Sequence, residues 1–234
     1  MFRRLGLQVR RYQGAERFSF DTDAALVQVV GSGARLILDV GANVGQSALW
    51  FRQLFPQATI HSFEPFPDSF TKLVAAVGDR PNHCLHPLAA AETSQRLQLH
   101  ANADATTNSL LASTRAGEKM VPSLVGRDRV PVEAIRLDDF CQQHHITNID
   151  LLKLDIQGGE AMALRGATGL LKRGEIRVVF TEVLFADLYQ GQAEFGEIAE
   201  LLRGFGFRLF SLSNVAYADD GAMAWGDAIF RRSN

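Results

Sequence analysis

Cysteine is scarce in this sequence. The chain has two, Cys84 and Cys141, which lie far apart and form no C-x-x-C pair. That spacing excludes a zinc knuckle and a dithiol redox couple. We therefore expect two buried or half-buried thiols, as in proteins of a reducing compartment.

Long apolar runs are also missing. No run reaches the roughly 18 residues that a membrane span needs. The start, MFRRLGLQVRRYQG, is rich in arginine and has no apolar block of the kind found in secretory signals. The sequence predicts no membrane span and a cytoplasmic protein.

The chain has almost no excess of charge of either sign. The 24 Lys and Arg residues nearly balance the 26 Asp and Glu residues, giving a formal charge of −2, which argues against a nucleic-acid partner. A local basic patch exists near the start, made of Arg3, Arg4, Arg10, Arg11 and Arg17. We interpret residues 1–30 as a solvated N-terminal arm or a cap helix, and a nucleic-acid adaptor is the alternative interpretation.

The remaining composition is that of a folded domain, with 47% apolar residues in 234. Apolar runs at 35–40 and 59–63 predict buried strands. After each run, apolar residues recur at helical spacing, which predicts helices from Val44 to Phe55 and over 68–77. Asp68 or Ser69 could cap the second helix. A third short strand is expected at 83–88. This β-α alternation predicts an α/β fold, a parallel sheet with helices on both faces.

The alternation breaks between about residues 90 and 135. Alternating stretches at 96–100 and 130–135, separated by a polar segment, predict an inserted hairpin or flap. Beyond it, helices are expected at 137–144, 160–172 (closed by Gly174) and 195–203, and strands at 149–154, 177–183, 207–213 and 225–230. One domain over 31–234 with this insertion is the simplest organisation.

The segment LILDVGANVGQ, residues 36–46, is the most informative. Gly41 and Gly45 would allow backbone without side chains to approach a cofactor closely, Asp39 could accept a hydrogen bond from a cationic amine or from the amides of the turn, and Asn43 could hold the turn. The spacing differs from the dinucleotide pattern G-x-G-x-x-G. An acid beside the loop would repel a pyrophosphate and suits a cofactor that carries positive charge.

Glu64 ends the next predicted strand, where a carboxylate can accept both hydroxyls of a ribose. Two acids at neighbouring strand ends therefore favour a nucleoside cofactor with a cationic group, and S-adenosylmethionine fits. An NAD(P)-dependent oxidoreductase shares the sheet and the acid, so it remains the alternative enzyme. A non-catalytic scaffold that binds the cofactor is the alternative outside the enzymes.

Taken together, LILDVGANVGQ, IHSFEPFP, HPLAAAE, DLLKLDIQGGE followed by ALRGA, and FTEV resemble the FkbM family of S-adenosylmethionine-dependent methyltransferases. The resemblance implies a Rossmann-like class I methyltransferase fold, with a seven-stranded, mostly parallel sheet whose last strand is antiparallel. It also implies methyl transfer to a hydroxyl of a sugar or another hydroxylated small-molecule or natural-product acceptor. Nothing in the sequence sets the oligomeric state, and a homodimer is left open.

By the same resemblance, Phe66 would lie near the adenine and Ala89 would pack against the base. The implied cofactor-binding set is Asp39, Gly41, Ala42, Asn43, Gly45, Glu64, Pro65, Phe66, Ala89 and Asp155. The polar residues Thr107, Asn108 and Ser109 match a family segment that lies over the active site, and they could hydrogen-bond a polyhydroxylated acceptor.

The motif Lys153, Asp155, Gly158 and Glu160 follows a strongly predicted strand, at whose carboxyl end ligands bind in open α/β sheets. We expect Asp155 or Glu182 to remove the hydroxyl proton, with Glu160 completing an acidic floor. Gln157 departs from the family pattern, which has an acid there. The metal site is unknown, and Mg²⁺ dependence is left open.

Overall fold

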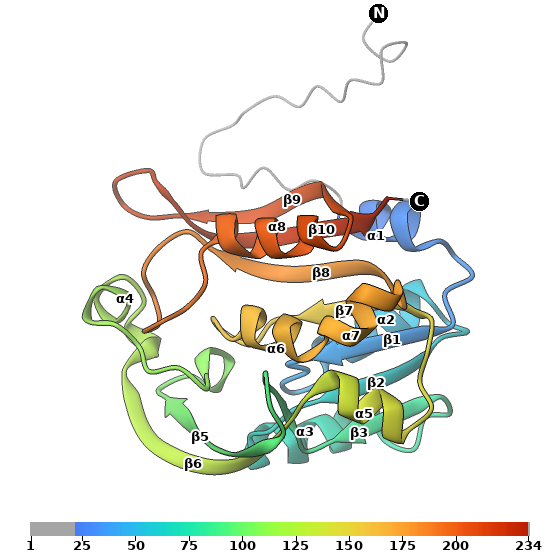
Figure 1. Cartoon of the computed structure of the whole chain (residues 1–234). Coiled ribbons are helices and arrows are strands. Elements are labelled where there is room, and N and C mark those ends of the chain that lie inside the picture. Colours follow the sequence, from blue (N-terminus) through green and yellow to red (C-terminus); the bar gives the residue numbers. More distant parts are fainter. Residues whose placement is uncertain (1–21, 234) are drawn as a thin grey trace, which may run out of the picture.

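A computed structural model of the chain describes residues 22–233. Seven strands form one sheet in the order β3-β2-β1-β7-β8-β10-β9 (Figure 1). The strands are β1 (Leu36–Val40), β2 (Thr59–Phe63), β3 (His83–His86), β7 (Ile149–Leu154), β8 (Ile176–Leu184), β9 (Phe207–Tyr217) and β10 (Met223–Arg232). β1, β2, β3, β7 and β8 pair in parallel, whereas β10 is antiparallel to both of its neighbours. The expected mostly parallel sheet with an antiparallel last strand is confirmed.

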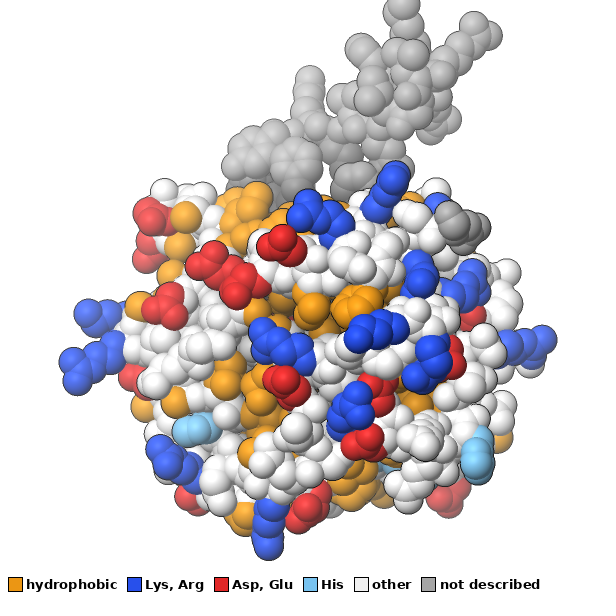
Figure 2. All heavy atoms as spheres, viewed as in Figure 1, with side chains coloured by type: hydrophobic (Ala, Val, Ile, Leu, Met, Phe, Trp, Pro, Cys, Tyr) orange, Lys and Arg blue, Asp and Glu red, His pale blue; other side chains and the backbone are white. Residues whose placement is uncertain are grey.

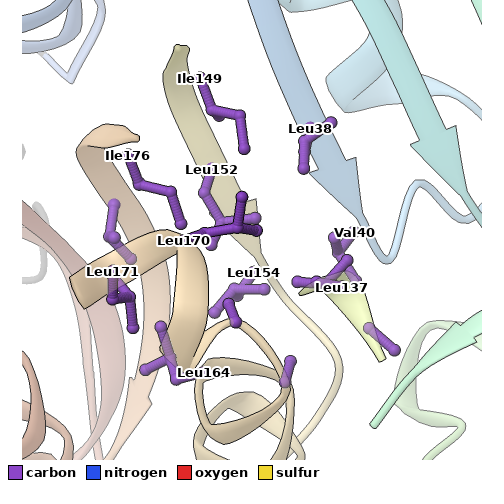
Figure 3. Close-up of a cluster of buried hydrophobic side chains, with 14 of the residues drawn as sticks. Leu38, Val40, Leu137, Ile149, Leu152, Leu154, Leu164, Leu170, Leu171 and Ile176 are labelled. Atoms are coloured by element: carbon purple, nitrogen blue, oxygen red, sulfur yellow. The ribbon is translucent and has the colours of Figure 1, made fainter. Parts of the chain in front are cut away.

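Helices cover both faces of this sheet, as predicted. They are α1 (Thr22–Val30), α2 (Gln46–Leu54), α3 (Pro67–Val77), α5 (Leu137–Gln143), α6 (Glu160–Gly166), α7 (Thr168–Arg173) and α8 (Phe195–Gly204). Because successive strand residues point to opposite faces, Leu38 and Val40 of β1 pack in the cluster that includes α5 to α8, whereas Ile37 packs with α1 and α2. Figure 3 shows part of the first cluster, where strand leucines meet Leu164 and Leu170 of the helices.

The predicted insertion is present as a second, smaller sheet with the order β4-β6-β5. β4 (Ala89–Ala90) pairs in parallel with β6 (Gly126–Ile135), and β5 (Gln95–Asn102) is antiparallel to β6, which confirms the hairpin. Between β5 and β6 lie η2 (Ala105–Thr107), α4 (Arg115–Met120) and η3 (Pro122–Leu124). In Figure 1 this green segment lies beside the main sheet.

Three local predictions were wrong. The third strand ends at His86, because Pro87 follows it, and the chain re-enters pairing as β4 of the second sheet. The helix expected over 160–172 is divided at Ala167 into α6 and α7, where Gly166 lies against the carbonyl of Ala91. Neither Asp68 nor Ser69 caps α3. The helix begins one residue earlier, with Pro67 at a position that proline favours.

The arginines expected to form a basic patch lie in residues 1–21, outside the described residues.

Cys84 is half-buried and Cys141 is buried, and both are free, as expected. Basic and acidic side chains are interspersed over the face shown in Figure 2. No helix within residues 22–233 is long and apolar enough to cross a membrane.

Candidate active site

A cavity of about 410 Å³ opens where the loop after β1 meets the ends of β2, β7 and β8 and the insertion. This volume is within the usual range for small-molecule sites. Since β1, β2, β7 and β8 are parallel, their carboxyl ends share one edge of the sheet and their terminal side chains converge. The predicted residues that line the cavity are Gly41, Ala42, Asn43, Glu64, Pro65, Ala89, Thr107, Asn108, Ser109, Asp155 and Glu182.

Four residues of the predicted set, Asp39, Gly45, Phe66 and Glu160, do not line the cavity. Glu160 is buried at the start of α6, where its Oε1 accepts a hydrogen bond from the Ile156 amide at 2.9 Å. Burial raises the pKa of Glu160 to about 7, although hydrogen bonds from backbone amides, first that of Ile156, oppose the rise. The contacts of Glu160 are those of a residue that stabilises the turn after β7.

Glu64, which follows β2, connects the loop after β1 to the loop after β2. Its Oε2 accepts a hydrogen bond from the Asn43 amide at 2.9 Å, and its Oε1 accepts one from the Phe66 amide at 2.8 Å. Burial raises the pKa of Glu64, and the two amides partly oppose this by stabilising the carboxylate. Each oxygen can accept a further hydrogen bond, so the carboxylate can still receive two hydroxyl groups.

The two glycines of the loop also have a role in the fold itself, whether or not a cofactor approaches them. Gly41 has φ of 81°, and a Cβ there would lie 1.9 Å from the carbonyl oxygen of Asp155. Gly45 has φ of 101°, and a Cβ there would lie 3.2 Å from Leu73. Both glycines are therefore required by the fold itself, through left-handed backbone and close packing, whatever a bound cofactor requires.

The first prediction is that Gly41→Ala destabilises the fold. Left-handed backbone and displacement of the Asp155 carbonyl should together cost about 3 kcal/mol, which is a fall in Tm of roughly 6–12 °C for a domain of this size. Thermal unfolding followed by circular dichroism measures the change. The matched control is Gly33→Ala, where a Cβ meets nothing within 4 Å and φ is not left-handed. Equal Tm values for the two variants would contradict the packing argument.

Asp39 lies beneath the loop, completely buried, and a cationic amine does reach it, that of Lys153. Lys153 Nζ lies 3.4 Å from Asp39 Oδ1 and donates to the carbonyl oxygen of Gly41 at 2.6 Å. Asp39 Oδ2 accepts hydrogen bonds from the hydroxyls of Ser47 and Ser62. Burial alone would lower the pKa of Lys153, but the carboxylates around it, first that of Asp39, outweigh burial and raise the pKa. Lys153 therefore stays charged and fixes the loop to β7.

Asp155 and Glu182 are joined through Gln157. The Gln157 side-chain nitrogen donates to Asp155 Oδ1 at 3.0 Å and to Glu182 Oε2 at 2.8 Å. Its Oε1 lies 2.8 Å from the hydroxyl of Tyr189. Gln157 has φ of 57°, which turns the chain sharply after β7 and aims the amide between the two acids. An amide at this position holds two carboxylates together without adding a third negative charge.

This arrangement changes the acidity of the groups around it. Burial, and then the charges of Asp155, Glu160 and Asp227, raise the pKa of Glu182 well above its ordinary value, while Lys153 opposes the rise. Burial, and then the charges of Glu182, Glu160 and Asp155, also raise the pKa of Tyr189, so its hydroxyl stays protonated and can donate. The raised pKa makes the Glu182 carboxylate a stronger base than an ordinary carboxylate.

The polar residues of the insertion are largely occupied by contacts within the chain. Ser109 Oγ donates to the carbonyl oxygen of Gln157 at 2.7 Å and accepts a hydrogen bond from the Leu111 amide. Thr107 Oγ1 donates to the Asp104 carbonyl, and Asn108 Oδ1 accepts a hydrogen bond from the Asn102 amide. Asn108 Nδ2 is the exception, because it is buried and has no hydrogen-bond partner among the described residues. These side chains shape the insertion and fasten it to the turn after β7.

Comparison with solved structures shows the class of fold to which the chain belongs. The chain resembles the crystal structure of precorrin-6y C5,15-methyltransferase from Geobacter metallireducens GS-15, with a TM-score of 0.50 and 12% identity over 95% of this chain and 94% of that one. It also resembles a putative rRNA methylase from Clostridium thermocellum, with a TM-score of 0.51 and 9% identity over 97% and 99%. At these identities the likeness shows the fold, which is that of class I methyltransferases.

The family follows from sequence. Residues 39–209 match the model of the methyltransferase FkbM domain, and the chain belongs to this family. It is therefore an S-adenosylmethionine-dependent methyltransferase, as predicted, which decides against the oxidoreductase and scaffold alternatives.

Two curated relatives cover most of the chain. One is 2-O-methyltransferase NoeI of Sinorhizobium fredii (strain NBRC 101917 / NGR234), which is 31% identical over 73% of this chain and 72% of its own length. The other is 31-O-demethyl-FK506 methyltransferase FkbM of Streptomyces tacrolimicus, which is 27% identical over 78% and 76%.

Sequence reasoning gave no role to three residues that organise this site. Lys153 was visible in the motif, but its partner Asp39 is distant in sequence. Gln157 was recognised only as a departure from the family pattern. Tyr189, from the loop after β8, carried no local signal at all, because only the fold brings it to the turn after β7.

Proposed function

We propose that this methyltransferase acts on a hydroxyl group of a small-molecule acceptor, with Glu182 as the general base. The observation that carries this proposal is that a single cavity is lined by Glu64 and by the Gln157-bridged pair of Asp155 and Glu182. A ribose-binding carboxylate and a candidate base thus share one space. The names of the two curated relatives each specify an oxygen as the methylated atom, which supports O-methylation.

The residues present fit S-adenosylmethionine. Glu64 would accept the ribose hydroxyls while its amide contacts keep the loops after β1 and β2 in place. The loop of Gly41, Ala42 and Asn43 would face the cofactor, and Ala89, buried at the start of the second sheet, would lie against the adenine. When bound, the cofactor supplies the methyl group and a sulfonium charge that the neighbouring carboxylates stabilise.

The two acids have unequal surroundings, which supports separate roles. Asp155 has Gln157 on one oxygen and Lys153 Nζ at 3.7 Å from the other. Glu182 has Gln157 on Oε2, and within residues 22–233 its Oε1 makes no hydrogen bond or ion pair that would compete with a substrate hydroxyl. Glu182 would accept the hydroxyl proton as the acceptor oxygen is alkylated, and Asp155 would orient the acceptor.

Calorimetric titration tests the cofactor half of this proposal. The wild-type protein should bind S-adenosylmethionine, and Glu64→Ala should weaken binding about 10- to 100-fold, because hydrogen bonds to a charged group contribute about 1.5–3 kcal/mol. Glu133→Ala, which changes an exposed acid of β6, is the control. Thermal unfolding of Glu64→Ala separates loss of binding from loss of fold. Tight binding of NAD without binding of S-adenosylmethionine would refute the proposal.

Release of S-adenosylhomocysteine over sets of sugars, lipids and phenols tests the acceptor half. Within residues 22–233 no group of three or more His, Cys, Asp or Glu side chains is placed to hold a metal ion. Each acceptor is therefore assayed with and without EDTA, which separates turnover that needs a divalent ion from turnover that does not.

A further inference from the structure

One part of the cavity wall is apolar. Leu124 of η3, Leu184 at the end of β8, and Leu188 and Tyr189 of the following loop belong to one buried cluster, against which Val121 and Trp225 pack. All six side chains line the cavity. The insertion, the β8–α8 loop and β10 thus contribute to one continuous apolar surface that begins beside Glu182.

The chain on either side of several wall residues reaches the surface of the molecule. Met120 and Val125 flank the wall segment 121–124, and both are more than 40% exposed. Met223, two residues before Trp225 on β10, is also exposed, and the register of β10 with β9 shifts between these two residues.

Few polar groups at this wall could hydrogen-bond to the hydroxyls of a polyhydroxylated ring. The side chains of Thr107 and Ser109 hydrogen-bond within the chain, whereas Asn108 Nδ2 is buried and has no hydrogen-bond partner among the described residues. Apart from Thr106 and Asn108, the polar side chains beside this wall are those of Asp155, Gln157 and Glu182, where the reacting hydroxyl would be held. Each further hydroxyl placed against the apolar wall would lose its hydrogen bonds to water without replacement.

Given the methyl transfer proposed above, we propose that the acceptor is an alcohol on a predominantly apolar skeleton, bound along the wall of Val121, Leu124, Leu184, Leu188 and Trp225, and not a free sugar. Its hydroxyl lies against Glu182, and its skeleton lies along the five apolar side chains of the wall.

Direct binding tests this without requiring turnover. The chain has two tryptophans, so Trp50→Phe leaves Trp225 as the only indole, placed in the wall itself. With S-adenosylhomocysteine bound, 4-cyclohexylcyclohexanol should change the Trp225 emission and saturate, whereas myo-inositol and glucose should leave it unchanged at tenfold higher concentration. Absence of saturable binding by the apolar alcohol, or equal binding by the polyols, overturns the proposal.

Turnover and a wall variant give a second, independent readout. S-adenosylhomocysteine release should favour 4-cyclohexylcyclohexanol over myo-inositol and glucose by at least tenfold in kcat/KM. Val121→Asn should raise KM for the apolar alcohol about tenfold with little change in kcat. The matched control is Val74→Asn, on the exposed side of α3, which should behave as wild type. If KM is unchanged in Val121→Asn, the apolar wall does not contribute to acceptor binding.

The outcomes also distinguish this inference from the function on which it rests. A protein that binds S-adenosylmethionine and methylates only polyols would refute the apolar skeleton and leave the methyltransferase assignment intact. A protein that binds no S-adenosylmethionine would refute the proposed cofactor site, whatever Trp225 reports.

Discussion

Lys153→Met is expected to lower the free energy of unfolding by about 3–5 kcal/mol, the cost of leaving a buried charge without its partner. Asp39 is completely buried, and its ion pair is with Lys153, which is itself 4% exposed. The variant would also remove the hydrogen bond to the Gly41 carbonyl. Chemical denaturation measures the loss, and Lys172→Met, an exposed lysine of α7, is the control.

A double variant separates the charge from the lost packing. Asp39→Asn combined with Lys153→Met removes both charges, so it should be more stable than Lys153→Met alone. The two substitutions should therefore be strongly non-additive. A double variant whose loss equals the sum of the two single losses would show that Asp39 and Lys153 do not stabilise the fold as a pair.

Glu182→Gln is expected to lower kcat about 10²- to 10⁴-fold, the range over which a general base contributes. The affinity for S-adenosylmethionine should change by less than about twofold, because the variant keeps Glu64, the proposed ligand of the ribose. Asp155→Asn should also reduce kcat more than it alters cofactor affinity, but by less than Glu182→Gln. Asp187→Asn, an exposed acid of the loop after β8, serves as the control.

The pH dependence of kcat gives the same assignment a separate test. A general base must be ionised, so kcat should rise with pH through the raised pKa of Glu182 and stay low at the pH where an ordinary carboxylate is already ionised. Gln157→Glu places a third carboxylate beside the pair, which should move this rise to higher pH. A rise at the ordinary pH of a carboxylate, unmoved in Gln157→Glu, would assign proton removal to another group.

Much of the fold could be predicted because its strands are short apolar runs bounded by clear breakers. The runs ending at Val40, Phe63 and Leu154 are observed as β1, β2 and β7. Since these strands are parallel, the acids that follow them had to meet at one edge of the sheet, which placed Glu64 and Asp155 at the cavity. Local periodicity and strand direction were sufficient for this part.

The remainder depends on contacts between segments that are distant in the chain. The sequence indicates that Gly41 is special, but only the fold shows that the Asp155 carbonyl occupies the space of a Cβ. It indicates a polar insertion at Thr107 to Ser109, but not that these residues bond to Gln157 and Asp104. Pattern alone also could not divide the helix at Ala167, because the close approach of Ala91 to Gly166 comes from the second sheet.

The hydroxyl of Tyr189 lies near both the Gln157 side chain and the carbonyl of Thr107, 3.1 Å from the latter, and Ser109 bonds to the Gln157 backbone. A substitution in segment 105–110 would therefore alter the lining of the cavity and the surroundings of Gln157 together. We expect that grafting this segment from a relative transfers an acceptor preference only when the residues that replace Tyr189 and Gln157 are grafted with it.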